Sequence, residues 1–192
     1  IIAIALVLGV LGAIKGLETP IGDTQAGVPE LRADSRYNRD SNLISSRFSI
    51  GTDIINVIVE TKPDGCIDYQ VIDAIDRFAW HMANVQGVRD VMSLAGVSKV
   101  VSAGWSEGSL KWRNLPRDER QLVQAQNYIE TSTGLLNRDC SVMPVMIFTR
   151  DHKAATIGQL VSEVKKFEAE HGNKDVSFKL ATGNVGVMAA TN

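Results

Sequence analysis

The sequence predicts an α+β domain, and three observations lead to this class. A β-branched run at 54–59 is typical of a strand, and the segment 68–86 has the apolar spacing of an amphipathic helix. The same two patterns return later in the chain, which predicts the order β-α-β, an inserted helix with its loop, then β-α-β. Two such units pack as one sheet with helices on one face, the split β-α-β or ferredoxin-like arrangement.

The first unit has clear boundaries. The strand lies within 48–60 and is ended by the turn 61–65, which contains Pro63 and Gly65. The helix over 68–86 is closed by Gly87. Its apolar positions recur at steps of three and four: Val71, Ile72, Ile75, Phe78, Ala79, Met82 and Val85. The valines of 88–101 predict a second strand, bent or bulged near Gly96.

The second half repeats the alternation. A helix is expected over 118–136, and the apolar run 141–149 predicts a strand. Pro144 removes a ladder hydrogen bond, so it belongs at an edge, a bulge or the start of that strand. An amphipathic helix follows over 156–171, and Val176, Phe178 and Leu180 alternate as in a half-buried strand.

The first 14 residues contain no polar side chain. As a helix they would span about 21 Å, short of a bilayer core of about 30 Å. We therefore expect residues 1–17 to be the outer end of a transmembrane helix. Two alternatives stay open: the apolar region of a signal peptide and a buried soluble helix. Residues 18–47 are expected to be a polar connector with a short helix over 31–47, residues 48–186 the folded domain, and residues 187–192 the start of an outgoing segment.

Composition excludes several classes of function. The 192 residues carry a net charge of -2 with no basic stripe, so nucleic acid is not an expected partner. Two cysteines exclude a disulfide-dense scaffold, and the three histidines lack metal-ligand spacing. No nucleophile, base or paired-carboxylate spacing stands out, so we expect neither an enzyme nor a metal or other cofactor.

Large apolar side chains occur in the glycine-containing segment 102–116, which has no clean period. Trp105, Leu110 and Trp112 are therefore candidates for contact with a hydrophobic ligand or partner domain. The alternative, which the sequence favours, is that they close one end of the core beneath a long loop. Trp80 falls off the apolar stripe of its helix, and its role stays open.

Acidic and glycine-rich positions have simple structural interpretations. Asp68 is expected to cap the helix that follows it, and Asp64, Asp73 and Asp76 lie near the positive end of its dipole. The segment 183–186 resembles a phosphate-binding turn only weakly, and a tight strand-to-helix turn explains it better.

Cys66 and Cys140 are a candidate disulfide, because both lie in predicted loops just outside a strand or helix. An oxidising compartment would permit the bond. A sheet in which the first and third strands run parallel would instead place the two residues at opposite rims, beyond the Cα separation of about 7 Å that a disulfide tolerates. Both outcomes stay open.

Several segments resemble the resistance-nodulation-division (RND) superfamily of transporters, in particular its lipid-exporter branch of mycobacterial large membrane proteins and hopanoid exporters. Residues 27–35 (GVPELRADS) resemble the acidic, proline-containing segment between the first membrane helix and the first strand. Residues 78–82 (FAWHM) with 87–91 (GVRDV) resemble the passage from helix to strand, and 180–186 (LATGNVG) resemble the exit toward the second membrane helix.

This resemblance implies the periplasmic porter domain of a proton-driven exporter in the bacterial inner membrane. The implied partners are the second porter domain and the membrane helices of the same transporter, the membrane, and a hydrophobic or lipid-like substrate; a homo-oligomer is compatible with it. The proton-relay acids of the family lie in membrane helices outside this chain. The alternative is a self-contained, membrane-anchored binding or interaction module, which would lack the ten or more further hydrophobic spans of an exporter.

Overall fold

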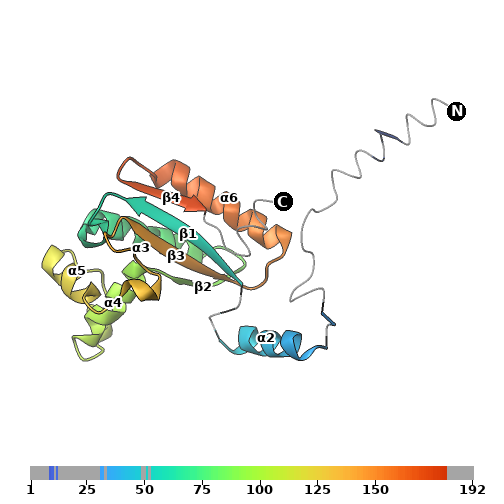
Figure 1. The fold of residues 1–192 in the computed structure, drawn as a ribbon, viewed down its shortest axis with the longest axis horizontal. Coiled ribbons are helices and arrows are strands. Elements are labelled where there is room, and N and C mark those ends of the chain that lie inside the picture. The colour runs from blue at the N-terminus through green and yellow to red at the C-terminus, as the bar shows by residue number, and fades with distance from the viewer. Residues whose placement is uncertain are drawn as a thin grey trace.

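The computed structural model describes residues 9–10, 12, 31–32, 34–48, 51 and 53–180, and it is an α+β structure (Figure 1). Its four-stranded sheet has the order β2-β3-β1-β4, and every neighbouring pair is antiparallel. The strands are β1 (Ile54–Thr61), β2 (Val88–Met92), β3 (Val142–Thr149) and β4 (Val176–Leu180). The described α-helices are α2 (Arg36–Arg47), α3 (Tyr69–Ala83), α4 (Leu94–Gly104), α5 (Glu119–Gln126) and α6 (Ala154–His171). Short 3-10 turns are η1 (Gly65–Ile67), η2 (Leu110–Trp112) and η3 (Thr131–Thr133).

The main core lies between one face of the sheet and the helices α3 and α6. Alternate residues of β1 and β3 point to this face, because successive side chains of a strand point to opposite sides. Phe78 of α3 packs against Phe167 of α6 and Phe178 of β4, with ring centroids 5.0 and 4.7 Å from its own. The fully buried members include Val57, Val59, Ile72, Ile75, Met82, Met143, Val145, Ile147 and Leu160.

The helices predicted around 68–86 and 156–171 are confirmed as α3 and α6. Asp68 is the N-cap of α3, as expected, and its carboxylate accepts a hydrogen bond of 2.9 Å from the backbone N–H of Gln70. Gly87 ends this segment with a φ of +96°, a conformation that favours glycine. Gly172 follows the last residue of α6.

The strand predicted over 88–101 is wrong beyond Met92, because residues 94–104 form the helix α4. The hydroxyl of Ser93 accepts a hydrogen bond of 3.1 Å from the N–H of Gly96, which caps the helix. Leu94 and Ser98 are buried on one side of α4 at a helical spacing. The valines favoured a strand by their intrinsic preference, but the cap and the period of about four decide for a helix.

The helix predicted over 118–136 is too long. Only Glu119–Gln126 form α5, and Thr131–Thr133 form the separate turn η3. The intervening and following residues include β-branched and hydroxyl side chains and Gly134, which takes a φ of +72°. Ile129 and Leu136, expected on the apolar side of that helix, still pack against the main core.

The first and third strands are antiparallel neighbours, so the parallel arrangement considered for them is also wrong. Ile55 pairs with Ile147, and Val59 pairs with Met143. The end of β1 therefore meets the start of β3 at one rim of the sheet. The chain enters β1 and leaves β4 at the opposite rim, since β4 is antiparallel to β1 as well.

Pro144 lies three residues into β3, near the strand start, as its missing N–H requires. The N–H of Thr61 donates to the carbonyl of Ser141 at 2.8 Å, so hydrogen-bonded pairs alternate along β1 and β3 from that point. Pro144 is opposite Ile58 in a pair without such bonds, and its nitrogen faces the side of β2. Pairing with β2 covers only Met146 to Thr149, so no ladder bond is lost.

The segment that returns from the insertion to β3 lies against the second face of the sheet. Met146 points to that face, opposite to its neighbours Val145 and Ile147. A Cβ atom on Gly134 would lie 3.7 Å from the Met146 side chain, and the adjacent Leu135 is buried. Ile54, Ile58 and Pro144 of this face are half-buried. The second face thus carries an apolar area beside the polar Asn56 and the Glu60–Lys179 ion pair, and the chain itself covers part of it.

The helix expected over 31–47 is confirmed in its later part as α2, which begins only at Arg36 because Ser35 caps it. Its apolar residues Tyr37, Leu43 and Ile44 are exposed. The segment 1–17 predicted to enter a membrane is described only at 9–10 and 12, and 187–192 lies outside the described residues. Among the residues that are described, no helix has both the length and the hydropathy to cross a bilayer.

Replacing Ser93 by Ala removes the cap of α4 and should lower the free energy of unfolding by about 1 kcal/mol. Ser109→Ala is the matched control, because Ser109 precedes η2 without a capping hydrogen bond from its side chain. Urea unfolding of the two variants measures the difference. Equal stabilities for both would contradict the assigned cap.

Candidate functional site

Two of the three predicted contact residues come together on the surface of the insertion between β2 and β3. Trp105 follows α4 and is 57% exposed, and Trp112 lies in η2 and is 51% exposed. These exposed fractions do not fit the alternative in which the indoles close one end of the core. Leu110 is 78% exposed, but it does not line the groove that the two indoles share.

The groove has a volume of about 270 Å³, and we call it the aromatic groove. It is lined by Ser102, Trp105, Ser106, Trp112, Asn114, Pro116, Gln121, Gln124 and Ala125. The ring of Tyr128 lies beside Trp105, with 6.2 Å between the ring centroids. The Lys111 ammonium lies 5.6 Å from the centroid of the Trp112 ring, at a distance typical of a cation–π contact.

Helical spacing brings the lining residues together. Positions 102, 105 and 106 follow the i, i+3, i+4 pattern at the end of α4, and 121, 124 and 125 follow it along α5. The two helices pack against each other. Ala103 and Ala125 are buried, and their small side chains permit a close approach of the backbones.

The lining of the aromatic groove is polar but uncharged. None of its nine lining residues carries a formal charge. Within the part of the chain that the structure describes, the amides of Asn114, Gln121 and Gln124 make no intramolecular side-chain hydrogen bond. These amides can therefore donate to and accept from a ligand, next to two indole rings.

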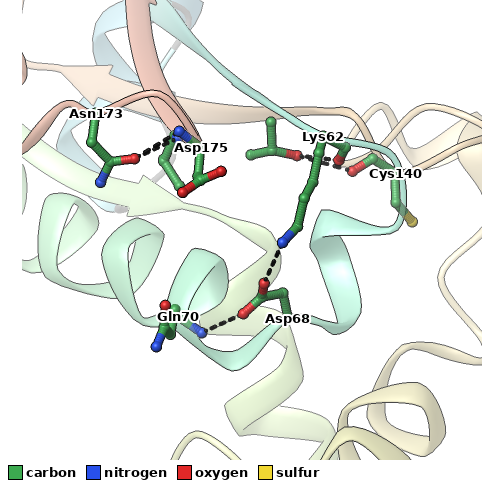
Figure 2. A network of polar contacts seen from close by, with 8 residues as sticks. Lys62, Asp68, Gln70, Cys140, Asn173 and Asp175 are labelled. Atoms are coloured by element: carbon green, nitrogen blue, oxygen red, sulfur yellow. Dashed lines mark hydrogen bonds and ion pairs between the residues drawn. The ribbon is translucent and has the colours of Figure 1, made fainter.

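A second hollow, of about 360 Å³, lies between the start of α3 and the α6–β4 turn. Figure 2 shows Lys62 reaching Asp68, with 3.3 Å between ammonium and carboxylate, while Asp68 also caps α3. The amide oxygen of Asn173 accepts from the N–H of Asp175 at 2.8 Å and so holds the turn. The side chains of Lys62, Asp68 and Asn173 are thus bonded within the chain and have a structural role, whereas those of Gln70 and Asp175 make no such bond among the described residues.

The other acidic candidates of α3 are paired with cations. Asp73 lies 2.7 Å from the Arg77 guanidinium one turn along the helix, and Asp76 lies 2.6 Å from the Lys99 ammonium of α4. The second of these pairs links the two helices. Trp80 is 72% exposed on α3, away from the aromatic groove. The glycine-containing segment 183–186 lies outside the described residues.

Cys66 and Cys140 form a disulfide, with 5.3 Å between their Cα atoms. The antiparallel pairing of β1 with β3 makes this possible, because both cysteines lie at the rim where β1 ends and β3 begins. The N–H of Asp64 donates to the carbonyl of Asp139 at 2.8 Å and continues the contact beyond the strands.

The insertion is also anchored to this rim by α5. The buried side-chain amide of Gln126 donates to the carbonyl of Cys66 at 2.8 Å. Residue 65, next to Cys66, has little room for a side chain. A Cβ atom on Gly65 would lie 2.2 Å from the Thr61 hydroxyl and 3.3 Å from the Cys140 carbonyl. The disulfide and this hydrogen bond position the helix that supplies Gln121 and Gln124.

Sequence reasoning found the two indoles but missed the polar half of the groove. Ser102, Ser106, Asn114, Gln121 and Gln124 carry no motif. Four of them share helical spacing, beside Trp105 or along α5, whereas Asn114 lies outside the helices. At the end of α4 that signal was hidden, because the valines of 88–101 predict a strand and 102–116 has no clean period.

Reduction of the disulfide should lower the free energy of unfolding by about 4 kcal/mol, as chain-entropy arguments give for a closed loop of this size. The sequence separation of the two cysteines is 74 residues. Urea unfolding with and without dithiothreitol measures the change, and Cys66→Ala/Cys140→Ala should be insensitive to the reductant. Two titratable thiols in the native, unreduced protein would contradict the bond.

Asp139 should titrate below its ordinary value of 3.8. The Ser141 hydroxyl, and then the Ser141 backbone N–H, donate to its carboxylate and lower its pKa. A lowered pKa stabilises the folded chain above the unfolded value, and this contribution is lost as the pH falls through the folded pKa. In an NMR titration Ser141→Ala should raise the pKa of Asp139, whereas the control Ser132→Ala should leave it unchanged. An unchanged pKa of Asp139 in Ser141→Ala would refute Ser141 as the cause of the lowered value.

No protein-family model matches the chain, and no curated protein matches it.

Proposed function

We propose that this chain is the periplasmic porter domain of a proton-driven RND exporter that moves hydrophobic or lipid-like molecules out across the bacterial inner membrane. In this proposal the domain acts by conformational change and catalyses no covalent step. The resemblance of 27–35, 78–91 and 180–186 to the lipid-exporter branch supports it.

We further propose that the fold is the ferredoxin-like arrangement expected from the order of elements. The strand order β2-β3-β1-β4, with all neighbours antiparallel, supports this assignment. So does the common position of α3 and α6 on one face of the sheet. The insertion of α4, η2 and α5 between β2 and β3 is an addition to that arrangement.

The observation that carries the proposal is the position of the chain's entry and exit at a single rim. The backbone enters β1 at Ile54 and leaves β4 at Leu180 on the same side of the sheet. A domain inserted between two membrane helices needs this geometry, because both helices must start from the same surface. The insertion, with the aromatic groove, extends from the opposite rim and is free to meet cargo or a neighbouring domain.

The second face of the sheet suits a moving partner. It carries the apolar residues Ile54, Ile58 and Met146, which are half-buried and covered only in part by 131–135. With Asn56 and the Glu60–Lys179 pair beside them, they form a mixed surface. Such a surface suits an interface that forms and opens during alternating access, because inter-domain interfaces are more polar than obligate ones.

The double change Trp105→Ala/Trp112→Ala in the complete transporter should reduce export of a hydrophobic substrate several-fold. The chain itself should stay folded, because both indoles are half exposed. Export from cells measures the first effect, and the urea midpoint of the isolated chain measures the second.

Trp80→Ala is the matched control, since this indole is exposed on α3 and lies outside the aromatic groove. Undiminished export by the double variant would refute the role of the groove in transport. Unfolding of the double variant would show instead that the indoles are structural.

A further inference from the structure

The aromatic groove combines two kinds of surface that a lipid tail does not need together. Trp105 and Trp112 offer indole rings, and the remaining lining is mostly amide and hydroxyl groups. An acyl chain in the groove would cover the amides of Asn114, Gln121 and Gln124 without offering them a hydrogen bond. A polar group that is buried without a hydrogen bond loses its bonds to water, and this cost opposes such a ligand.

Ionic ligands also fit the groove poorly. A phosphate or carboxylate would need a free cationic side chain or helix N-terminus. The lining contains no charged residue, the nearby Lys111 ammonium lies over the Trp112 ring, and the Asp118 carboxylate already caps the N-terminus of α5. A quaternary ammonium group is attracted by indole rings, but no carboxylate lines the groove to balance its charge. The remaining ligand class is neutral, carries many hydroxyl groups, and has a flat apolar side.

We propose that the aromatic groove binds a neutral saccharide. A pyranose ring has a face of C–H groups that can pack on an indole, and its hydroxyl groups lie around the edge of the ring. The side-chain amides both donate and accept, so they can match hydroxyls that do the same. Ser106 adds a hydroxyl beside Trp105.

The dimensions of the groove set the size of the ligand. Its volume of about 270 Å³ is close to the lower end of small-molecule sites, which span about 300–1,000 Å³. Such a groove suits one or two sugar rings at a time. Because the groove is open and its indoles stay half exposed, we expect weak binding to a short stretch of a longer glycan.

The groove opens on the insertion, at the rim opposite to the entry of β1 and the exit of β4. A saccharide held there would approach from the side away from the flanking segments. The inference rests on the proposed function in taking this groove as the surface that meets a ligand outside the chain. It goes beyond that function, because a hydroxyl-rich ligand matches the lipid-like substrate proposed above only where the sugar is carried by a lipid headgroup.

The test uses the full 192-residue chain with cellopentaose and maltopentaose as probes. Saturation-transfer NMR and tryptophan fluorescence should both report saturable binding of at least one of them. Trp112→Ala should weaken binding about tenfold or more, and Gln121→Leu/Gln124→Leu several-fold, whereas Trp80→Ala should change it by less than about twofold. Equal effects of Trp80→Ala and Trp112→Ala, or no saturable binding of either probe or of the vesicles described next, would overturn the site.

A second arm separates the two sources of a sugar. Vesicles of phosphatidylcholine with and without a neutral galactolipid are offered to the same variants. If the chain binds only vesicles that contain the galactolipid, and Trp112→Ala abolishes this binding, the ligand is a saccharide presented by a lipid headgroup. If the chain binds the soluble probes but neither kind of vesicle, the ligand is a free glycan. Equal binding to plain phosphatidylcholine vesicles, lost in Trp112→Ala, would overturn the saccharide in favour of an apolar surface.

The outcome is distinguishable from that of the transport experiment. Saccharide binding by the chain, with normal export by Trp105→Ala/Trp112→Ala, would keep the site and remove its role in transport. Impaired export without saccharide binding would keep the proposed function and remove this inference.

Discussion

The antiparallel pairing of β1 with β3 is the constraint on which the rest of the structure depends. It brings the end of one central strand to the start of the other, so that Cys66 and Cys140 meet although 74 residues separate them. Because β4 also runs antiparallel to β1, the same pairing sends the entry and exit of the chain to the other rim. One rim thus holds the insertion, and the other holds the connections to the flanking segments.

The insertion is small, and its position depends on anchors more than on a core of its own. Leu122 and Ala125 are buried along α5, while Gln126 bonds to the Cys66 carbonyl and the disulfide closes the return to β3. Lys99 and Asp76 join α4 to α3. With the backbone held in this way, the indoles can remain on the surface, where removing them costs little core packing.

The two hollows of the surface differ in how their polar groups are used. Between α3 and the α6–β4 turn, Lys62, Asp68 and Asn173 bond to groups of the chain itself and so hold its local structure (Figure 2). In the aromatic groove, the amides of Gln121 and Gln124 have no partner within the described residues. Within the described residues the side chains of Gln70 and Asp175 in the polar hollow lack an internal partner as well, but only the aromatic groove combines such groups with two exposed indoles, which favours it as a recognition surface.

Local pattern alone determined the α+β class, the helices α3 and α6, the strands β1, β3 and β4, and the cap at Asp68, because period and capping chemistry act over a few residues. The sequence also located Trp105 and Trp112 as candidates. The helix over 94–104 and the end of α5 at Gln126 have local causes as well, the Ser93 cap and Gly134 among them, but the valines of 88–101 and the apolar positions up to Leu136 outweighed these signals. Only the tertiary structure decided that the cysteines pair and that polar residues from α4 and α5 share a groove. These outcomes depend on which strands become neighbours, and contacts between residues far apart in the chain leave no periodic trace in either segment.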